Sequence, residues 1–73
     1  MSICDDIRQI VHDELGVHGG DAETLGSMGA DRDLCRVIEE RINELFRLKP
    51  PLRGFVTPDL TIGDICNEVN GRS

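Results

Sequence analysis

The sequence has almost no aromatic residues. Tryptophan and tyrosine are absent, and only two phenylalanines, Phe46 and Phe55, occur among the 73 residues. Aromatic residues favour strands, whereas a core of isoleucine, leucine, valine, cysteine and methionine suits packed helices. A chain of this length buries only about 60% of the surface that its unfolded form exposes, so the core is thin. We therefore expect one small all-α domain that spans residues 1–73.

Basic residues are also scarce. Eight lysines and arginines stand against fourteen aspartates and glutamates, which gives a net charge of −6. This negative charge repels nucleic-acid phosphates and anionic lipids, so we expect neither as a partner and expect a protein partner to be basic. No apolar run is long enough to span a bilayer, and the first ten residues carry acid where a signal peptide carries lysine or arginine. These features predict a soluble, cytoplasmic protein.

The three cysteines follow no familiar pattern. Cys4, Cys35 and Cys66 are odd in number and widely spaced, which fits neither a disulfide framework nor a Cys-x-x-Cys metal site. His12 and His18 lack the spacing of helical metal ligands. We expect reduced thiols that act as small core residues, two surface histidines and no metal.

The N-terminal segment predicts a helix over residues 3–15. Ser2 and Asp5 form a capping-box-like pair at its start, and Gly16 supplies the left-handed residue that commonly ends a helix. Apolar residues recur at the spacing of one helical face, and these are Ile3, Ile7, Ile10, Val11 and Leu15.

The strongest helix signal covers residues 32–47. Asp31 is the expected N-cap, because a carboxylate there accepts hydrogen bonds from unpaired amides and favours the positive end of the helix dipole. Pro50 and Pro51 are expected to stop the helix. Its predicted apolar stripe consists of Leu34, Cys35, Val37, Ile38, Ile42, Leu45 and Phe46.

A last helix is expected to begin at Thr61, with Asp64 as its capping partner, and to close at Gly71. Its apolar face consists of Ile62, Ile65, Cys66 and Val69.

The glycine-rich loop before the second helix is expected to be pinned by Val17, Leu25 and Met28. The proline-rich residues 50–60 are expected to form at most one helical turn, anchored by Leu52, Phe55 and Val56. The sequence thus predicts a small bundle of three to four helices.

Three segments together resemble the acyl carrier protein family. "IRQIVHDELGV" is similar to the family's first helix and its Leu-Gly-Val exit, "MGADRDLCRVIEERINELF" to its Leu-Gly-Ala-Asp-Ser-Leu segment and second helix, and "LTIGDICNEVNG" to its Thr-Val-Gly-Asp final helix. The match runs nearly end to end. The resemblance implies a carrier fold, in which a serine at the start of the second helix receives a phosphopantetheine arm whose thiol holds an acyl, aminoacyl or peptidyl group.

Arg32 occupies the position that matches the carrier serine when residues 29–46 are aligned without gaps. Attachment of the arm needs a hydroxyl oxygen that attacks coenzyme A, and a guanidinium with a pKa above about 12 has no nucleophilic lone pair. A shift of one residue would place Asp33 there, which fails for the same purpose. Ser27 is the one serine nearby, but it lies in the glycine-rich loop rather than beside Asp31.

The charges of the second helix differ from the acidic helix that the resemblance implies. Acidic and basic residues alternate along it, so its field is largely cancelled. Arg32 and Arg36 lie one turn apart at its start, where they can hold a phosphate or a partner's carboxylate. The alternative is an ordinary solvated surface in which Asp31 and Asp33 pair with them. Cys35 near the helix start suggests a substitute thiol, but its spacing favours an inert core residue.

Two functions are compatible with these sequence features. In the first, the domain carries no cofactor and is a non-catalytic, monomeric protein-binding module, an adaptor, regulator or decoy, whose partner is for example an enzyme that binds carrier proteins. In the second, it is a working acyl or aminoacyl carrier in fatty acid, polyketide or nonribosomal peptide biosynthesis, with phosphopantetheine at a displaced site. No nucleophile–base pair indicates an enzyme. We favour the first, with a partner surface made of Asp31, Arg32, Asp33, Arg36, Glu39, Glu40 and Glu44.

Overall fold

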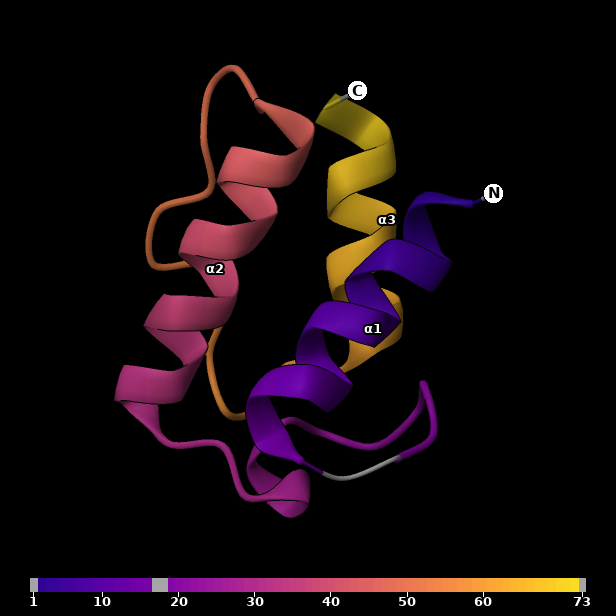
Figure 1. Ribbon diagram of the computed structural model, residues 1–73, viewed down its shortest axis with the longest axis vertical. Helices are drawn as coiled ribbons and strands as arrows, with labels where there is room; N and C mark the ends of the chain where they lie inside the picture. Colours follow the sequence, from indigo (N-terminus) through magenta and orange to yellow (C-terminus); the bar gives the residue numbers. More distant parts are fainter. Residues whose placement is uncertain (1, 17–18, 73) are drawn as a thin grey trace.

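Three helices form the domain in the computed structural model, which describes residues 2–16 and 19–72. They are α1 (Ile3–Leu15), α2 (Arg32–Phe46) and α3 (Ile62–Arg72), and a 3-10 turn, η1 (Gly26–Met28), precedes α2. Figure 1 shows α2 along one side of the molecule, with α1 crossing in front of α3 on the other side. The described part contains no strand, only an isolated bridge between Thr24 and Thr61. The all-α prediction is confirmed, whereas Val17 and His18 lie outside the described residues.

Side-chain caps fix the starts of all three helices. The Ser2 hydroxyl accepts a hydrogen bond from the Asp5 amide at 3.1 Å. The Asp31 carboxylate accepts one from the Leu34 amide at 2.8 Å. At α3 the Thr61 hydroxyl accepts from the Asp64 amide and the Asp64 carboxylate accepts from the Thr61 amide, at 3.1 and 3.2 Å. These are the caps that the sequence predicts, and each satisfies a backbone amide that the helix itself leaves unpaired.

Two helix ends differ from the predictions. α2 ends at Phe46 because Arg47 adopts the left-handed conformation with φ 49°, so the helix stops before it reaches Pro50. α3 does not close at Gly71 but continues to Arg72. The Arg72 guanidinium donates to the Glu68 carboxylate at 2.9 Å and to the Pro50 carbonyl at 2.8 Å, and these bonds hold the last turn. No short helix forms between α2 and α3 in the described chain.

The core draws on all three helices and on both connections. Ile7, Ile38 and Ile65 are fully buried, one from each helix. The predicted loop anchors that the structure describes are buried or half-buried, and these are Leu25, Met28, Leu52, Phe55 and Val56. The apolar stripe of α2 is narrower than predicted, because 39% of Val37 and 55% of Leu45 are exposed.

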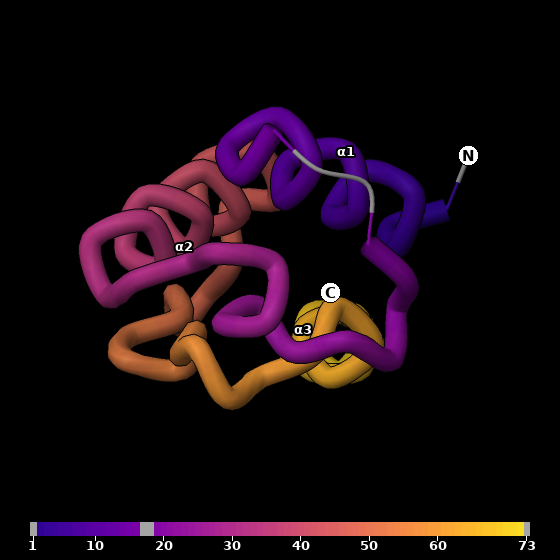
Figure 2. The backbone as a smooth tube through the Cα atoms, turned by 90° about the horizontal axis from the view of Figure 1, so that it is seen from below, coloured from indigo at the N-terminus to yellow at the C-terminus, as the bar shows by residue number. Residues whose placement is uncertain are grey.

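The two connections meet at one end of the bundle, where they lie close together in Figure 2. The Leu25 amide donates to the Leu60 carbonyl at 2.8 Å, and the Gly26 amide donates to the Pro58 carbonyl at 2.7 Å. These bonds pair the glycine-rich loop with the proline-rich one. The segment that follows α2 is therefore held in place by the glycine-rich loop between α1 and α2 as well as by α2 itself.

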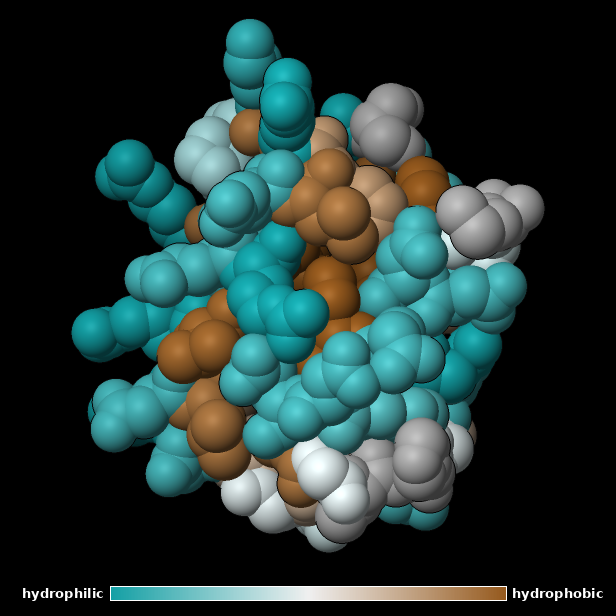
Figure 3. Space-filling model, viewed as in Figure 1, coloured by the Kyte–Doolittle hydropathy of each residue, from teal (hydrophilic) through white to brown (hydrophobic). Residues whose placement is uncertain are grey.

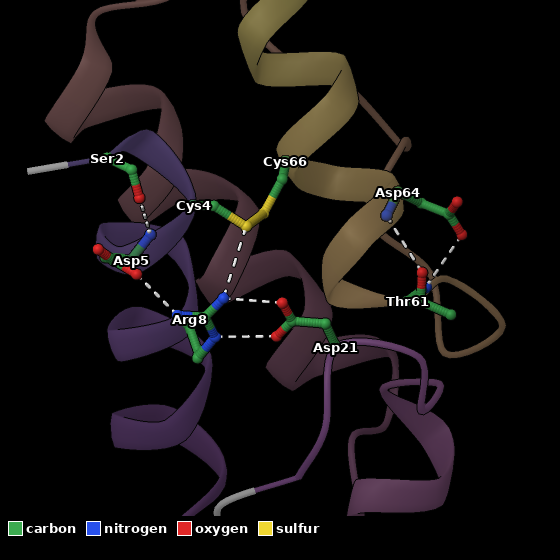
Figure 4. The surroundings of a disulfide bond; sticks show 8 residues. All are labelled: Ser2, Cys4, Asp5, Arg8, Asp21, Thr61, Asp64 and Cys66. Atoms are coloured by element: carbon green, nitrogen blue, oxygen red, sulfur yellow. Dashed lines mark hydrogen bonds and ion pairs between the residues drawn. A yellow bond between two sulfur atoms is a disulfide. The ribbon is translucent and has the colours of Figure 1, made fainter.

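Cys4 and Cys66 form a disulfide, so the prediction of reduced thiols is wrong for both. The bond joins the first turn of α1 to the middle of α3, and their Cα atoms are 5.1 Å apart (Figure 4). Cys35 is the free cysteine and is buried, as predicted. Disulfides persist mainly in oxidising compartments, so this bond lends no support to the cytoplasmic prediction, which stays a prediction. None of the helices in the described residues has the length and apolar character needed to cross a membrane.

Candidate partner-binding surface

Arg32 is the first residue of α2, directly after the capping residue Asp31, and its side chain is exposed. Arg36 follows one turn later and is also exposed. Within the described residues, no carboxylate lies within 4 Å of either guanidinium. The alternative in which Asp31 and Asp33 pair with these arginines is therefore not the arrangement found. The Asp31 carboxylate instead caps the helix.

Both arginines line a surface pocket of about 530 Å³ between α2 and the connection that follows it. The opposite wall comes from residues 54–59. The complete lining is Arg32, Arg36, Glu39, Gly54, Val56, Thr57, Pro58 and Asp59. Sequence reasoning found the α2 side of this pocket but missed the loop side, because hydrophobic periodicity gives no information about where an irregular segment returns.

Glu39 fastens the loop to α2. Its carboxylate accepts hydrogen bonds from the amides of Gly54, Phe55 and Val56, at 3.2, 2.9 and 3.1 Å. Gly54 has φ 64°, a left-handed conformation that glycine adopts without strain, and it turns the loop so that successive amides face one carboxylate. Glu39 is half-buried. The predicted contact residue Glu39 thus shapes the pocket from within, and its charge is directed at the loop.

Further along α2 the exposed surface is mixed in character. Asp33, Glu40 and Glu44 are exposed, and Val37 and Leu45 expose apolar atoms beside them. A second, shallower pocket of about 280 Å³ is lined by Arg41, Glu44 and Leu45. Figure 3 shows apolar patches that interrupt the polar surface over α2.

No family model, curated protein or solved structure matches the chain.

Cys35 does not offer a substitute nucleophile. Burial, together with the negative charges of Asp31 and Glu39, raises the pKa of the Cys35 thiol. A position near a helix start lowers the pKa of an exposed thiol, whereas this thiol is desolvated and lies near two carboxylates, and both effects raise its pKa. The residue is only 1% exposed, and the raised pKa of its thiol disfavours the thiolate that a nucleophile needs.

Ser27 lies in the 3-10 turn η1, apart from the start of α2. Its hydroxyl is exposed and donates to the Thr24 carbonyl at 2.8 Å, while its amide donates to the Thr24 hydroxyl at 3.2 Å. The resemblance to carrier proteins implies phosphopantetheine on a hydroxyl at the start of the second helix, and Arg32 offers no hydroxyl. The residues that begin α2 therefore do not fit this group.

The acidic surface of α1 is partly neutralised by ion pairs that sequence reasoning missed. The Arg8 guanidinium donates to Asp5 at 2.8 Å and to both oxygens of Asp21, at 2.8 and 2.7 Å (Figure 4). These hydrogen bonds lower the pKa of both carboxyls. On the neighbouring side, Arg41 of α2 pairs with Glu14 of α1 at 2.8 Å. The α1 face is consequently less available to a basic partner than its composition indicates.

Histidines and carboxylates do not gather into a metal site in the part of the chain that the structure describes. His12 is half-buried, and its Nε2 lies 3.2 Å from the Gly19 carbonyl oxygen. This contact gives His12 a role in holding the first loop against α1. His18, the other predicted surface histidine, lies outside the described residues.

Proposed function

We propose that this chain is a carrier-like, non-catalytic protein-binding module that is not loaded with phosphopantetheine at the start of α2. The observation that carries the proposal is the exposed Arg32 as the first residue of α2, directly after the capping Asp31. This is the position at which the resemblance to acyl carrier proteins places the modified serine. The order of the helices, with the longest second, supports that resemblance.

The proposed contact surface is the exposed side of α2 together with the pocket at its start. Interfaces commonly combine exposed apolar side chains with a charged rim, and α2 offers both. Leu45 and Val37 supply the apolar atoms, and Asp33, Glu40 and Glu44 supply exposed charge. The partner is another protein, for example an enzyme that binds carrier proteins, and the module acts on it as an adaptor or decoy.

Intact-mass measurement tests whether the chain can be loaded. The protein is co-expressed with a broad-specificity phosphopantetheinyl transferase, and we expect its mass to stay unchanged. The matched variant Arg32→Ser restores a hydroxyl at the same exposed position, and we expect it to gain the arm. That gain would show that only the side chain at this position prevents loading.

The same measurement distinguishes the proposed module from a carrier with a displaced site. A gain of the arm by the unmodified chain would overturn the proposal. If Ser27→Ala then abolished that gain, the chain would be a carrier loaded in the first loop. If Arg32→Ser also stays unmodified, the resemblance to carrier proteins loses its support, although the exposed surface of α2 remains to be tested by binding.

Affinity capture from the native host tests the surface. Leu45→Glu places a charge at a side chain that is 55% exposed, so the core is not disturbed. We expect this variant to lose a partner that the unmodified chain retains. Asn67→Glu is the control, because Asn67 is exposed on α3. Equal capture by Leu45→Glu and the unmodified chain would rule out this side of α2 as the contact.

A further inference from the structure

The pocket at the start of α2 presents two guanidinium groups, of Arg32 and Arg36, that form no ion pair within 4 Å with any carboxylate of the described residues. Arg32 and Arg36 stand one above the other on the same helix face, which is the spacing at which two side chains can reach one ligand. Elsewhere in the described chain several arginines are already paired, and these are Arg8, Arg41 and Arg72. The guanidinium groups of the pocket are therefore available to a group from outside the chain.

The opposite wall of the pocket is formed before any ligand arrives. The Glu39 carboxylate accepts three hydrogen bonds from residues 54–56, which fixes this loop against α2. Val56 is buried and Pro58 half-buried, so they give the pocket an apolar side, and Thr57 adds an exposed hydroxyl. Preformed walls reduce the entropy lost when a ligand is held.

The charges around the pocket select one kind of anion. Asp59 and Glu39 also line the pocket, so a doubly charged phosphate meets two negative groups as well as two positive ones. The Leu34 amide at the helix start already donates to Asp31 and is not free to hold phosphate oxygens. A carboxylate carries a single charge, and its planar pair of oxygens matches the fork of a guanidinium.

We propose that this pocket receives a single aspartate or glutamate side chain from an exposed segment of the partner protein. The inference rests on the proposed function, because it names the chemistry by which the protein-binding module recognises its partner. The net charge of the chain predicts a basic partner, whereas this pocket binds an acidic side chain. The molecule as a whole repels acid, whereas this pocket accepts one carboxylate and leaves Asp59 to reject segments with a second negative charge close by.

Titration with a short peptide tests the pocket without knowledge of the partner. The probe is the amide of N-acetyl-Ala-Ala-Glu-Ala-Ala, added to the isotope-labelled intact chain and followed by NMR. We expect saturable shifts at the Nε–H groups of Arg32 and Arg36 and at the amides of residues 54–59. The same peptide with glutamine in place of glutamate is expected to bind at least about tenfold more weakly, since it lacks the charge-assisted hydrogen bonds.

Variants that each lose one positive charge show which arginines bind the glutamate peptide. Arg32→Ala and Arg36→Ala are each expected to weaken binding of the glutamate peptide about tenfold. Arg53→Ala is the control, because Arg53 is exposed, loses the same charge and does not line the pocket. Its affinity should stay within about twofold of the unmodified chain. All three side chains are exposed, so circular dichroism should show the same helix content in each variant.

Three results would overturn the inference. They are equal binding of the glutamine peptide, inorganic phosphate that binds at the same residues as tightly as the glutamate peptide, and a loss in Arg53→Ala that equals the loss in Arg36→Ala. Other results test the proposed function independently of the pocket. A pantetheine adduct on the unmodified chain would refute the module, while capture that is lost in Leu45→Glu but retained in both pocket variants would leave the module standing and refute the pocket.

Discussion

The disulfide between Cys4 and Cys66 is expected to supply a large part of the stability of this domain. It joins residues 62 apart in the sequence, so it restrains nearly the whole chain when the protein unfolds. In the chain-entropy treatment a closed loop of this length lowers the entropy of the unfolded state by about 14 cal/mol/K, which is about 4 kcal/mol at 25 °C. A domain of this size has a total stability of about 4–11 kcal/mol. Reduction should therefore leave it marginally stable.

Urea unfolding measures this loss directly. Far-UV circular dichroism is the suitable probe, because the chain is helical and has no tryptophan or tyrosine for fluorescence. The oxidised chain and the same chain in a phosphine reductant are compared at neutral pH. We expect the free energy of unfolding to fall by about 4 kcal/mol on reduction. Cys35 is a thiol in both samples, so its burial contributes equally to both.

The double variant Cys4→Ser/Cys66→Ser provides the control. It should unfold much as the reduced chain does and should not respond to the reductant. Reduction that changes the free energy of unfolding by less than about 1 kcal/mol would refute this prediction. So small a change would show that the disulfide does not restrict the unfolded chain to the extent expected for a loop of this length. A reductant effect of equal size in the double variant would also refute it.

Three local contacts give predictions of their own. Glu39→Gln removes the charge that holds the loop and should cost about 1–2 kcal/mol in urea unfolding, with faster amide exchange at Phe55; unchanged exchange there would contradict this. Iodoacetamide should leave Cys35 unmodified in the folded, oxidised chain and label it in urea, because burial raises the pKa of the thiol; rapid labelling without urea would show that the thiol is accessible. The hydrogen bonds from Arg8 lower the pKa of Asp21, so they add stability above the ordinary carboxyl pKa of about 3.9 that is lost as the pH falls through the lower folded value. Arg8→Ala should remove this part of the acid dependence, and an unaltered pH profile in that variant would exclude the pair as its source.

Local chemistry explains which parts of the fold were predictable. Ser2, Asp31 and Thr61 are short polar residues placed directly before apolar periodic segments, and a cap needs only this local arrangement. Arg47 is different, because nothing in its side chain favours a left-handed conformation, so the end of α2 could not be read from the sequence. The extension of α3 through Gly71 likewise depends on a bond from Arg72 to a carbonyl far away in the chain.

Contacts between distant residues explain what the sequence could not predict. Cys4 and Cys66 become partners only because α1 crosses α3 at their level, and neither spacing nor an odd number of cysteines contains that information. The pocket likewise depends on contacts between residues that are distant in the sequence. Its α2 side follows from helical spacing, but the wall that includes Thr57 and Asp59 depends on Glu39 reaching three amides of a loop more than a dozen residues away.

The absence of a hydroxyl side chain from α2 does not depend on how the chain is aligned with carrier proteins. The sequence of α2 is RDLCRVIEERINELF, which contains no serine, threonine or tyrosine at any position. The capping hydrogen bond from Leu34 to Asp31 fixes where this helix begins, so no shift of register can bring a hydroxyl to its first turn. The one thiol within it belongs to Cys35, which is buried and whose pKa is raised by that burial. A phosphopantetheine arm would therefore need a residue outside α2, and in the proposed function α2 binds its partner through its charges and its two exposed apolar side chains, Val37 and Leu45.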